Sequence, residues 1–336
     1  MNLRIGALLR GRIRSLGSHP SGWIVQPRAA RLSGMTCDEH HTHRHHAHAP
    51  DEREWRAMVD QVELEGEVLL SFVTDTADWV TELRHADAPP LRRILDIGSG
   101  PGVGTCELAR LFPAAAVTAV DNSPAMLERT TRRAAEHGLA DRVSTHLGEV
   151  PVGLDGLGSA DLIWASMSLH HIGDEVGSLQ VIRELVRPHG LLAIAEFGEP
   201  MRMLPDAIGF GRPGLFERLD HVGATWLKQM RDGLTGSVVS TDLASMLASA
   251  GFDVVDSRLS RQRIDAPLPE NARRFALGYL RRARNQFQGL IEDDDLLALD
   301  VLTDPDDELS VVHRPDVFVD ASRQIVIARP VGGRLS

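Results

Sequence analysis

The stretch Ile94-Leu95-Asp96-Ile97-Gly98-Ser99-Gly100-Pro101-Gly102-Val103-Gly104-Thr105 decides the fold of this chain. Its apolar beginning is a predicted strand, and a predicted helix starts at Val103. Glycine has no Cβ, so a run of glycines lets the backbone turn tightly and come close to a ligand. An ordinary tight turn explains two glycines, but four in seven residues directly after a strand favour a binding loop. In an open parallel sheet, ligands bind beyond the carboxyl ends of the strands, which is where this loop lies.

Short apolar runs alternate with helical patterns on both sides of the loop. The expected strands are 93–97, 116–121, 143–147, 162–166, 190–197, 252–257 and 323–328. The expected helices are 51–84, with a break near Gly66 or residues 74–76, then 103–111, 124–137, 174–186, 241–250, 270–290 and 293–302. Strand–helix repetition at this spacing predicts a parallel sheet with right-handed crossovers. Residues 198–238 interrupt the rhythm with a loop-rich stretch of glycine and proline.

The second signal is Asp121, which closes the strand after the glycine loop. A carboxylate there can accept hydrogen bonds from both hydroxyls of a ribose while the loop holds the rest of a cofactor. Asn122 and Ser123 follow it and are typical helix caps, so capping is the competing role for Asp121. Its position relative to the glycines favours ribose binding.

Two classes of cofactor fit such a loop and carboxylate, namely dinucleotides and S-adenosylmethionine. The usual dinucleotide motif is G-x-G-x-x-G. The glycines here stand at Gly98, Gly100, Gly102 and Gly104, and the acid Asp96 lies two residues before the first. This arrangement resembles the D-x-G-x-G-x-G motif of class I S-adenosylmethionine-dependent methyltransferases.

The resemblance extends over roughly residues 91–197. Val120 to Leu127 resembles the second motif of the family, and Gly148-Glu149 stands where the family commonly has Gly-Asp after the third strand. Asp161 to Ile172 resembles the fourth-strand motif of the group that includes quinone-biosynthesis methyltransferases. Leu185 to Leu192 resembles the turn into the fifth strand. The chain is therefore similar to the small-molecule members of this family.

The resemblance implies a set of residues that bind S-adenosyl-L-methionine. The glycines bring the backbone close to the cofactor, Asp96 positions the methionine amino group and Asp121 binds the ribose. Glu149, longer than the usual Asp, meets the adenine amino group, with Val150 along the ring. The implied set is Asp96, Gly98, Ser99, Gly100, Gly102, Asp121, Asn122, Met126, Glu149, Val150, and Ala165 and Ser166, whose carbonyls lie near the methionine end.

The cofactor implies methyl transfer from a sulfonium to a nucleophilic oxygen, nitrogen, carbon or sulfur of a small-molecule acceptor. Because the leaving thioether is neutral, the protein mainly aligns the reactants and excludes water. A general base helps when the nucleophile carries a proton. His170 and His171 follow the fourth strand, and an imidazole titrates near neutrality. We therefore name His171, and after it His170, as the candidate base, with packing or capping of the next helix as the competing role.

The resemblance also implies the domain organisation. The fold is a doubly wound α/β fold, a seven-stranded, mostly parallel, Rossmann-like sheet with helices on both faces and an antiparallel last strand. Residues 51–90 form an N-terminal helical lid, and residues 91–330 form the cofactor-binding domain. Helical insertions at 198–238 and 259–322 cover the mouth of the site and select the acceptor. Residues 1–50 form an arginine- and histidine-rich tail that we expect to be disordered.

Composition limits the partners. The chain has a formal net charge of −11, and residues 1–37 hold six arginines and no acid, so the remainder is more acidic still. An acidic body repels phosphate backbones, which disfavours a nucleic-acid substrate. No apolar run approaches the ~18 residues that span a bilayer. The two cysteines, Cys37 and Cys106, fit a reducing cytosol, so we predict a cytoplasmic protein with no membrane partner and leave its oligomeric state open.

Two alternatives and one possible metal site are weighed against this interpretation. A NAD(P)-dependent oxidoreductase is disfavoured by the glycine spacing. A non-catalytic cofactor-binding regulatory protein would keep the fold without turnover, but no cofactor motif is broken. The histidine run at 40–48 could bind transition metals, yet a solvated tail explains it more simply, so no metal site is predicted.

Overall fold

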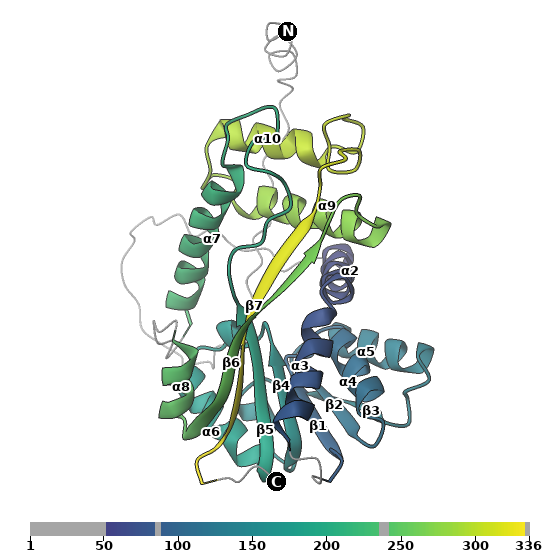
Figure 1. The fold of residues 1–336 in the computed structure, drawn as a ribbon, viewed down its shortest axis with the longest axis vertical. Helices are drawn as coiled ribbons and strands as arrows, with labels where there is room; N and C mark the ends of the chain where they lie inside the picture. Colours follow the sequence, from purple (N-terminus) through teal and green to yellow (C-terminus); the bar gives the residue numbers. More distant parts are fainter. Residues whose placement is uncertain (1–51, 85–88, 235–241, 333–336) are drawn as a thin grey trace, which may run out of the picture. The chain divides into compact units, whose positions relative to one another are not determined.

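A seven-stranded sheet in the order β3-β2-β1-β4-β5-β7-β6 forms the frame of the protein (Figure 1). The structure is a computed structural model and describes residues 52–84, 89–234 and 242–332. The strands are β1 (Arg93–Ile97), β2 (Ala116–Asp121), β3 (Val143–Leu147), β4 (Ala160–Ser166), β5 (Val186–Phe197), β6 (Phe252–Ile264) and β7 (Val319–Pro330). Six strands point the same way, and β7 is antiparallel to both β5 and β6. The predicted doubly wound α/β fold is confirmed.

Helices cover both faces of this sheet. They are α3 (Ser71–Leu83), α4 (Val103–Leu111), α5 (Pro124–Glu136), α6 (Glu175–Leu185) and α8 (Leu243–Ser249). The neighbouring residues Ile94 and Leu95 of β1 point to opposite faces, and both are fully buried. Ile94 joins an apolar core with α3 and α4, whereas Leu95 joins one with α6 and α8. A strand covered on both faces needs no polar side, which explains its continuous apolar run in the sequence.

The N-terminal helical region divides at a place that the sequence did not indicate. It forms α2 (Glu52–Val68) and α3, so the break falls at residues 69–70. The side chain of Gln262 on β6 spans this break, because its Nε2 donates to the carbonyl of Val68 at 2.6 Å and its Oε1 accepts from the hydroxyl of Ser71. Gly66 serves close packing instead, since a Cβ there would lie 3.0 Å from Cβ of Val103.

The segments beyond the sheet are more ordered than predicted. Residues 215–232, which fall in the expected loop-rich stretch, form the 18-residue helix α7 (Leu215–Asp232). The later segment holds α9 (Glu270–Gln286) and α10 (Asp293–Thr303). Strands β6 and β7 extend past their predicted ends toward α9, so the segment between them spans 265–318 (Figure 1). A third apolar core joins α7, α9 and α10 to the end of α2 and the start of α3.

All described residues belong to one unit that begins at Glu52. The predicted tail at 1–50 and its histidine run lie outside the described residues. Among the helices that the structure describes, none is long and apolar enough to cross a membrane.

Candidate functional site

The carboxyl ends of β1, β2 and β4 bring the predicted residues to one edge of the sheet. Ile97 at the end of β1 is in register with Val120 of β2 and Ala165 of β4. The residues that follow these three therefore leave the sheet side by side. The backbone of the glycine loop then turns over β2, where the amides of residues 98 and 99 both donate to the carbonyl of Val120, at 2.8 and 3.0 Å.

Two glycines of the loop are required by both conformation and space. Gly98 and Gly102 have φ angles of +68° and +80°, in the left-handed region that side chains disfavour. A Cβ would lie 2.4 Å from Cβ of Ser168 at the first position and 2.5 Å from Cγ2 of Thr130 at the second. Gly100 also has positive φ, but a Cβ there would only contact Val62 of α2, at 3.6 Å. Helix α2 thus lies against the loop.

Asp121 fastens this loop to the second strand. Its Oδ2 accepts from the amide of Gly100 at 2.9 Å, and its Oδ1 accepts from the amide of Ser123 at 2.9 Å. Burial raises the pKa of this carboxyl, although the amides of residues 123, 100 and 122 work in the opposite direction. The N-cap of α5 is Ser123, whose hydroxyl accepts from the amide of Met126, so Asp121 holds the turn before the helix and does not cap the helix itself. Each oxygen keeps a second lone pair, so the same carboxylate can also accept from a ribose.

Asp96 is buried beneath the loop, with 2% of its surface exposed. Its Oδ2 accepts a 2.6 Å hydrogen bond from the hydroxyl of Thr105 at the start of α4. Burial raises the pKa of Asp96 to about 7, the Thr105 hydrogen bond opposes this rise, and the charge of Asp121 adds to it. The protein stabilises the charged form of this carboxyl poorly. A cationic group of a ligand would therefore be a suitable partner for it.

The hydroxyl of Ser99 gives an independent test of whether the loop fits a ligand. Its Oγ is buried and has no hydrogen-bond partner among the described residues. Buried polar atoms in proteins are almost always paired, so an unpaired hydroxyl between two loop glycines is best explained by a partner that the protein itself does not supply. Together with Asp96, it fits the amino-acid end of S-adenosylmethionine.

The residues expected at the adenine end differ in how deeply they are buried. Glu149 is exposed, while Val150 is half-buried and packs against the core that contains α6 and α8. The amide of Gly148 donates to the carbonyl of Asp121 at 3.0 Å and so joins the ends of β2 and β3. In the turn before and at the start of α5, Asn122 is exposed and Met126 is buried.

The segment after β4 carries the two candidate histidines in the short turn Leu169–His171. Ala165 is fully buried and Ser166 half-buried at the end of β4. Met167 has a φ of +51°, which is strained for a residue with a side chain. The hydroxyl of Ser168 donates to the carbonyl of Ile97 at 3.1 Å, so this segment is attached directly to the end of β1.

Glu196 near the end of β5 holds this segment in place, and the sequence analysis missed it. Its Oε1 accepts from the amides of Ser168 and Leu169 at 3.0 and 2.8 Å, and its Oε2 lies 2.7 Å from Nδ1 of His170. The only sequence signal was an acid close to the end of a predicted strand. The ring of His170 also packs against those of His171 and Phe197, with centroids 4.1 and 4.6 Å away.

His171 is a weaker base than its sequence position suggested. The residue is exposed by its accessible surface, although protein atoms crowd its ring closely enough to disfavour the charged form. The protein around it nevertheless lowers its pKa to about 4, first by burial and then by the charge of His170, with Glu196 opposing the change. His171 is therefore uncharged at neutral pH and has little affinity for a proton.

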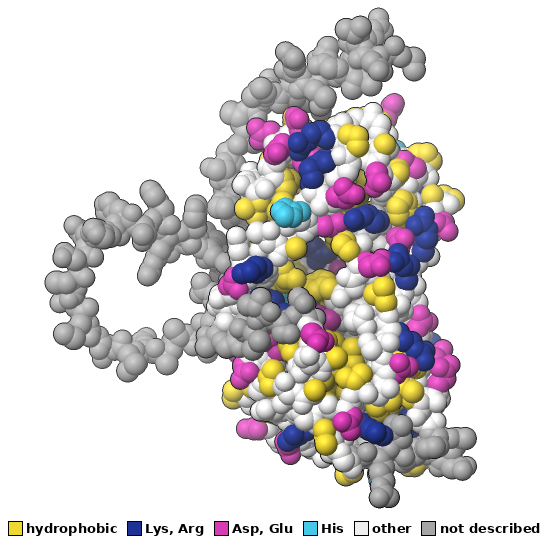
Figure 2. Space-filling model, turned by 60° about the vertical axis from the view of Figure 1, so that its left-hand side comes forward, with side chains coloured by type: hydrophobic (Ala, Val, Ile, Leu, Met, Phe, Trp, Pro, Cys, Tyr) yellow, Lys and Arg dark blue, Asp and Glu magenta, His cyan; other side chains and the backbone are white. Residues whose placement is uncertain are grey.

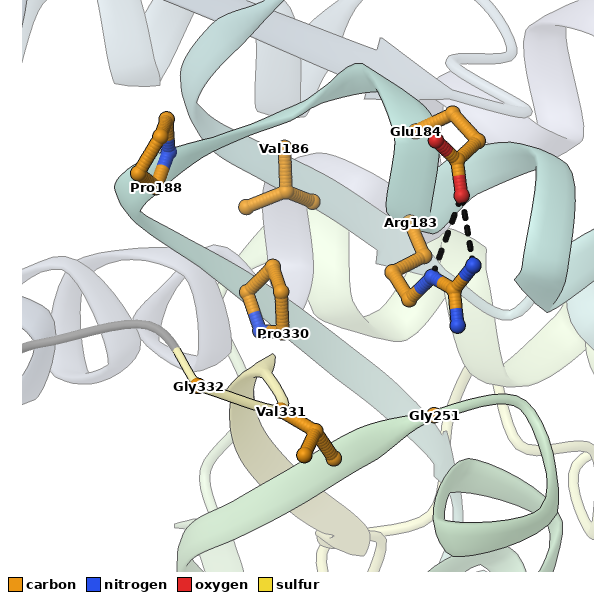
Figure 3. Close-up of a pocket in the computed structure, with 8 residues that line it drawn as sticks. All are labelled: Arg183, Glu184, Val186, Pro188, Gly251, Pro330, Val331 and Gly332. Carbon is orange, nitrogen blue, oxygen red and sulfur yellow. Dashed lines mark hydrogen bonds and ion pairs between the residues drawn. The ribbon is translucent and has the colours of Figure 1, made fainter.

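A separate pocket lies at the other end of the sheet (Figure 3). It has a volume of about 340 Å³ and lies beside Val186 at the start of β5 and Pro330 at the end of β7. The ion pair of Arg183 and Glu184 lies at its wall. Because β5 runs away from this pocket, it is remote from the carboxyl ends that carry the glycine loop. In the described part of the chain, no group of His, Cys, Asp and Glu side chains is placed to bind a metal ion.

The sheet is Rossmann-like, and the glycine loop and Asp121 lie at its carboxyl edge, where the resemblance to class I S-adenosylmethionine-dependent methyltransferases places them. A comparison with protein families agrees, because residues 94–190 match the Methyltransf_25 model, described as a methyltransferase domain. The resemblance inferred from the sequence is thus confirmed at the level of class.

Relatives with curated names match part of the chain. The malonyl-[acyl-carrier protein] O-methyltransferase of Laribacter hongkongensis is 30% identical over 178 residues, which cover 51% of this chain and 52% of the relative. The trans-aconitate 2-methyltransferase of Rhodopseudomonas palustris is 33% identical over 126 residues, 36% of this chain and 46% of the relative. The chain spans about half the length of these curated relatives. A solved S-adenosylmethionine-dependent methyltransferase from Geobacter sulfurreducens, in complex with S-adenosyl-L-homocysteine, aligns at a TM-score of 0.43 with 18% identity, covering 77% of this chain and 90% of that one.

Proposed function

We propose that this chain is an enzyme that transfers a methyl group from S-adenosylmethionine to a small-molecule acceptor. The observation that carries the proposal is the glycine loop fastened to Asp121, whose Oδ2 accepts from the amide of Gly100 at 2.9 Å. This contact joins the ends of the first two strands where an adenosine-bearing ligand binds in open parallel sheets. The match of residues 94–190 to a methyltransferase domain supports the same function.

The proposed donor site runs along the ends of three strands. Asp96 and the hydroxyl of Ser99 hold the amino-acid end, Asp121 holds the ribose, and the backbone at 165–166 faces the methionine end. Glu149 and Val150 take the adenine. Glu149 is exposed, so its carboxylate is free of the core and can turn toward an amino group. The donor supplies an activated methyl on a sulfonium. The chain itself aligns the donor with the acceptor, excludes water and takes up the proton that the acceptor releases.

We further propose that α2 is a lid over the donor and that the helices beyond the sheet select the acceptor. Val62 of α2 lies against the glycine loop, as described above. Helices α7, α9 and α10 share one apolar core with the end of α2, so they can shape an acceptor site next to the donor. The segments 198–238 and 265–318 therefore carry the choice of acceptor.

The proposal includes a small-molecule acceptor and a cytosolic location. On the face shown in Figure 2, the described Lys and Arg side chains are interspersed with Asp and Glu, which disfavours nucleic acid as a partner there. The location rests on the low cysteine content of the sequence.

Methyl transfer from radiolabelled S-adenosylmethionine tests the proposed function. Some relatives are named for methylating malonyl-acyl carrier protein and trans-aconitate, so the acceptor panel starts with these and continues with phenols, amines and thiols. We expect label to move to at least one small acceptor, and no reduction or oxidation of NAD(P) with any of them. Turnover of NAD(P), or binding of NAD in place of S-adenosylmethionine, would overturn the proposal.

A further inference from the structure

The carboxylate of Glu196 is the point where three hydrogen bonds of the segment after β4 converge. Two come from the backbone amides of Ser168 and Leu169 to Oε1, and the third joins Oε2 to Nδ1 of His170. The side chains of Glu196 and His170 are 15% and 10% exposed, so water competes little for these contacts. A buried carboxylate that accepts three hydrogen bonds is held firmly in one orientation.

This geometry determines which nitrogen of His170 carries the proton. An ionised carboxylate only accepts hydrogen bonds, so Nδ1 must be the donor. In the neutral ring Nε2 then has no hydrogen and presents a lone pair. Among the described residues, the hydrogen bond that the structure gives for the ring of His170 is the one from Nδ1 to Glu196. A carboxylate that accepts from one ring nitrogen commonly fixes the tautomer of a histidine that acts through the other.

We infer that Glu196 is a positioning residue for methyl transfer, which fixes His170 in the tautomer whose Nε2 accepts the proton of the acceptor. The inference rests on the proposed function. In the step, the acceptor's nucleophilic atom forms a bond to the methyl carbon while the carbon–sulfur bond breaks, and sulfur keeps the electron pair. The proton of the nucleophile moves to Nε2 of His170, and the resulting imidazolium is paired with the carboxylate of Glu196.

The alternative base, His171, lacks these features. Its pKa is lowered to about 4, so it takes up a proton poorly near neutrality. Its ring instead packs on that of His170, which also touches Phe197. These contacts hold the plane of the His170 ring, and Glu196 holds its Nδ1.

The tautomer of His170 can be measured directly by nitrogen-15 NMR of the full chain, without donor or acceptor. At a pH where the ring is neutral, we expect the signals of a proton on Nδ1 and none on Nε2. His146 supplies an internal reference for the opposite tautomer, because its Nε2 lies 2.7 Å from the carbonyl of Gly153 and must donate to it. Finding the proton of His170 on Nε2 in the wild type would overturn the inference.

Glu196→Gln makes a sharper test because the structure predicts how the new amide will turn. The two backbone amides require an oxygen at the Oε1 position, so the NH₂ group must face His170. It donates to Nδ1, and the proton of the ring must then move to Nε2. We expect the tautomer to reverse in this variant and to stay unchanged in Glu199→Gln, which loses only an exposed ion pair with Arg261. An unchanged His170 tautomer in Glu196→Gln would contradict the inference.

Kinetics with an acceptor from the panel complete the test. We expect Glu196→Gln to lower kcat by about tenfold or more, and His170→Ala by roughly a hundredfold, since general bases typically contribute 10²–10⁴-fold. Affinity for S-adenosylhomocysteine should stay within about twofold of wild type, because neither side chain is among those proposed to hold the donor. Loss of donor affinity in step with kcat would instead show a structural role. The tautomer of His170 is measured without turnover. If no methyl transfer is detected, the proposed function fails, but the tautomer result still stands by itself.

Discussion

Asp96 illustrates at the scale of one residue how burial changes chemistry. Its carboxyl is almost fully buried and has one side-chain hydrogen bond, from Thr105. Its pKa rises to about 7, against 3.8 for an ordinary Asp. Between these two values the folded protein holds a proton that the unfolded chain releases. The protonated carboxyl therefore favours the folded state at low pH, and this contribution is lost as the pH rises through 7.

The variant Asp96→Asn removes this titration. Near pH 4 we expect its free energy of unfolding to be close to that of the wild type, since both side chains are neutral. Near pH 8 it should exceed that of the wild type by roughly 2–4 kcal/mol, because only the wild type buries a charge. Urea unfolding across this pH range measures the difference. The exposed Asp155→Asn serves as control, and a stability difference for Asp96→Asn that stays constant with pH would contradict the assignment.

Residues such as Asp96 and Asp121 were predictable because their chemistry is local. The glycine loop and the two acids stand within one short stretch, and the strand before the loop fixes where they point. Glu196 was not predictable in this way. Its partner His170 lies 26 residues earlier, and only the pairing of β4 with β5 brings the two together.

At the scale of elements, α2 is fastened to α5 by ion pairs next to the glycine loop. Glu63 accepts from Arg129 at 2.7 Å and from Arg133 at 2.9 Å, and its side chain is 15% exposed. Arg133 also pairs with Glu67 at 2.8 Å. Since α2 touches the loop through Val62, these pairs hold the proposed lid against the donor site.

Weakening this attachment should open the lid. We expect Glu63→Gln to lose about 1 kcal/mol of stability, a value reduced for solvent screening of partly exposed pairs. Backbone amides of α2 should exchange hydrogen faster, and S-adenosylhomocysteine should dissociate several-fold faster. Glu128→Gln is the matched control, because Glu128 is exposed and forms an ion pair with Arg132 of its own helix, α5. Unchanged exchange and unchanged dissociation in Glu63→Gln would show that α2 is not a lid.

Helices and strands were predictable where their burial requires a regular pattern of apolar residues in the sequence. The buried strands β1 and β2 appear as apolar runs, and their observed bounds equal the predicted ones. The far end of β6 has no apolar run, since exposed residues such as Arg258 and Arg261 lie there. This part of the strand is extended because it pairs with β7. Helix α7 follows a glycine- and proline-rich stretch that obscured it. Its buried residues belong to an apolar core that includes α9 and α10, far along the chain.

At the scale of the whole molecule, two sets of elements in the described chain have separate roles. The sheet and its covering helices hold the ends of β1, β2 and β4 in register and so bring together the residues of the proposed donor site. The helices beyond the sheet have an apolar core of their own and join the sheet through α2, α3 and the long strands β6 and β7. This division explains why the class was predictable from residues 91–197, while the acceptor depends on segments that no motif describes.

Calorimetric titration of S-adenosylhomocysteine into the wild type and into Asp121→Asn tests the central claim most directly. We expect saturable binding to the wild type. In the variant we expect binding weaker by about tenfold or more, because the negatively charged acceptor of the ribose hydrogen bonds is lost. The exposed Asp141→Asn should bind as the wild type does. No binding to the wild type, or equal affinity in Asp121→Asn, would contradict the claim that the glycine loop and Asp121 together hold the methyl donor.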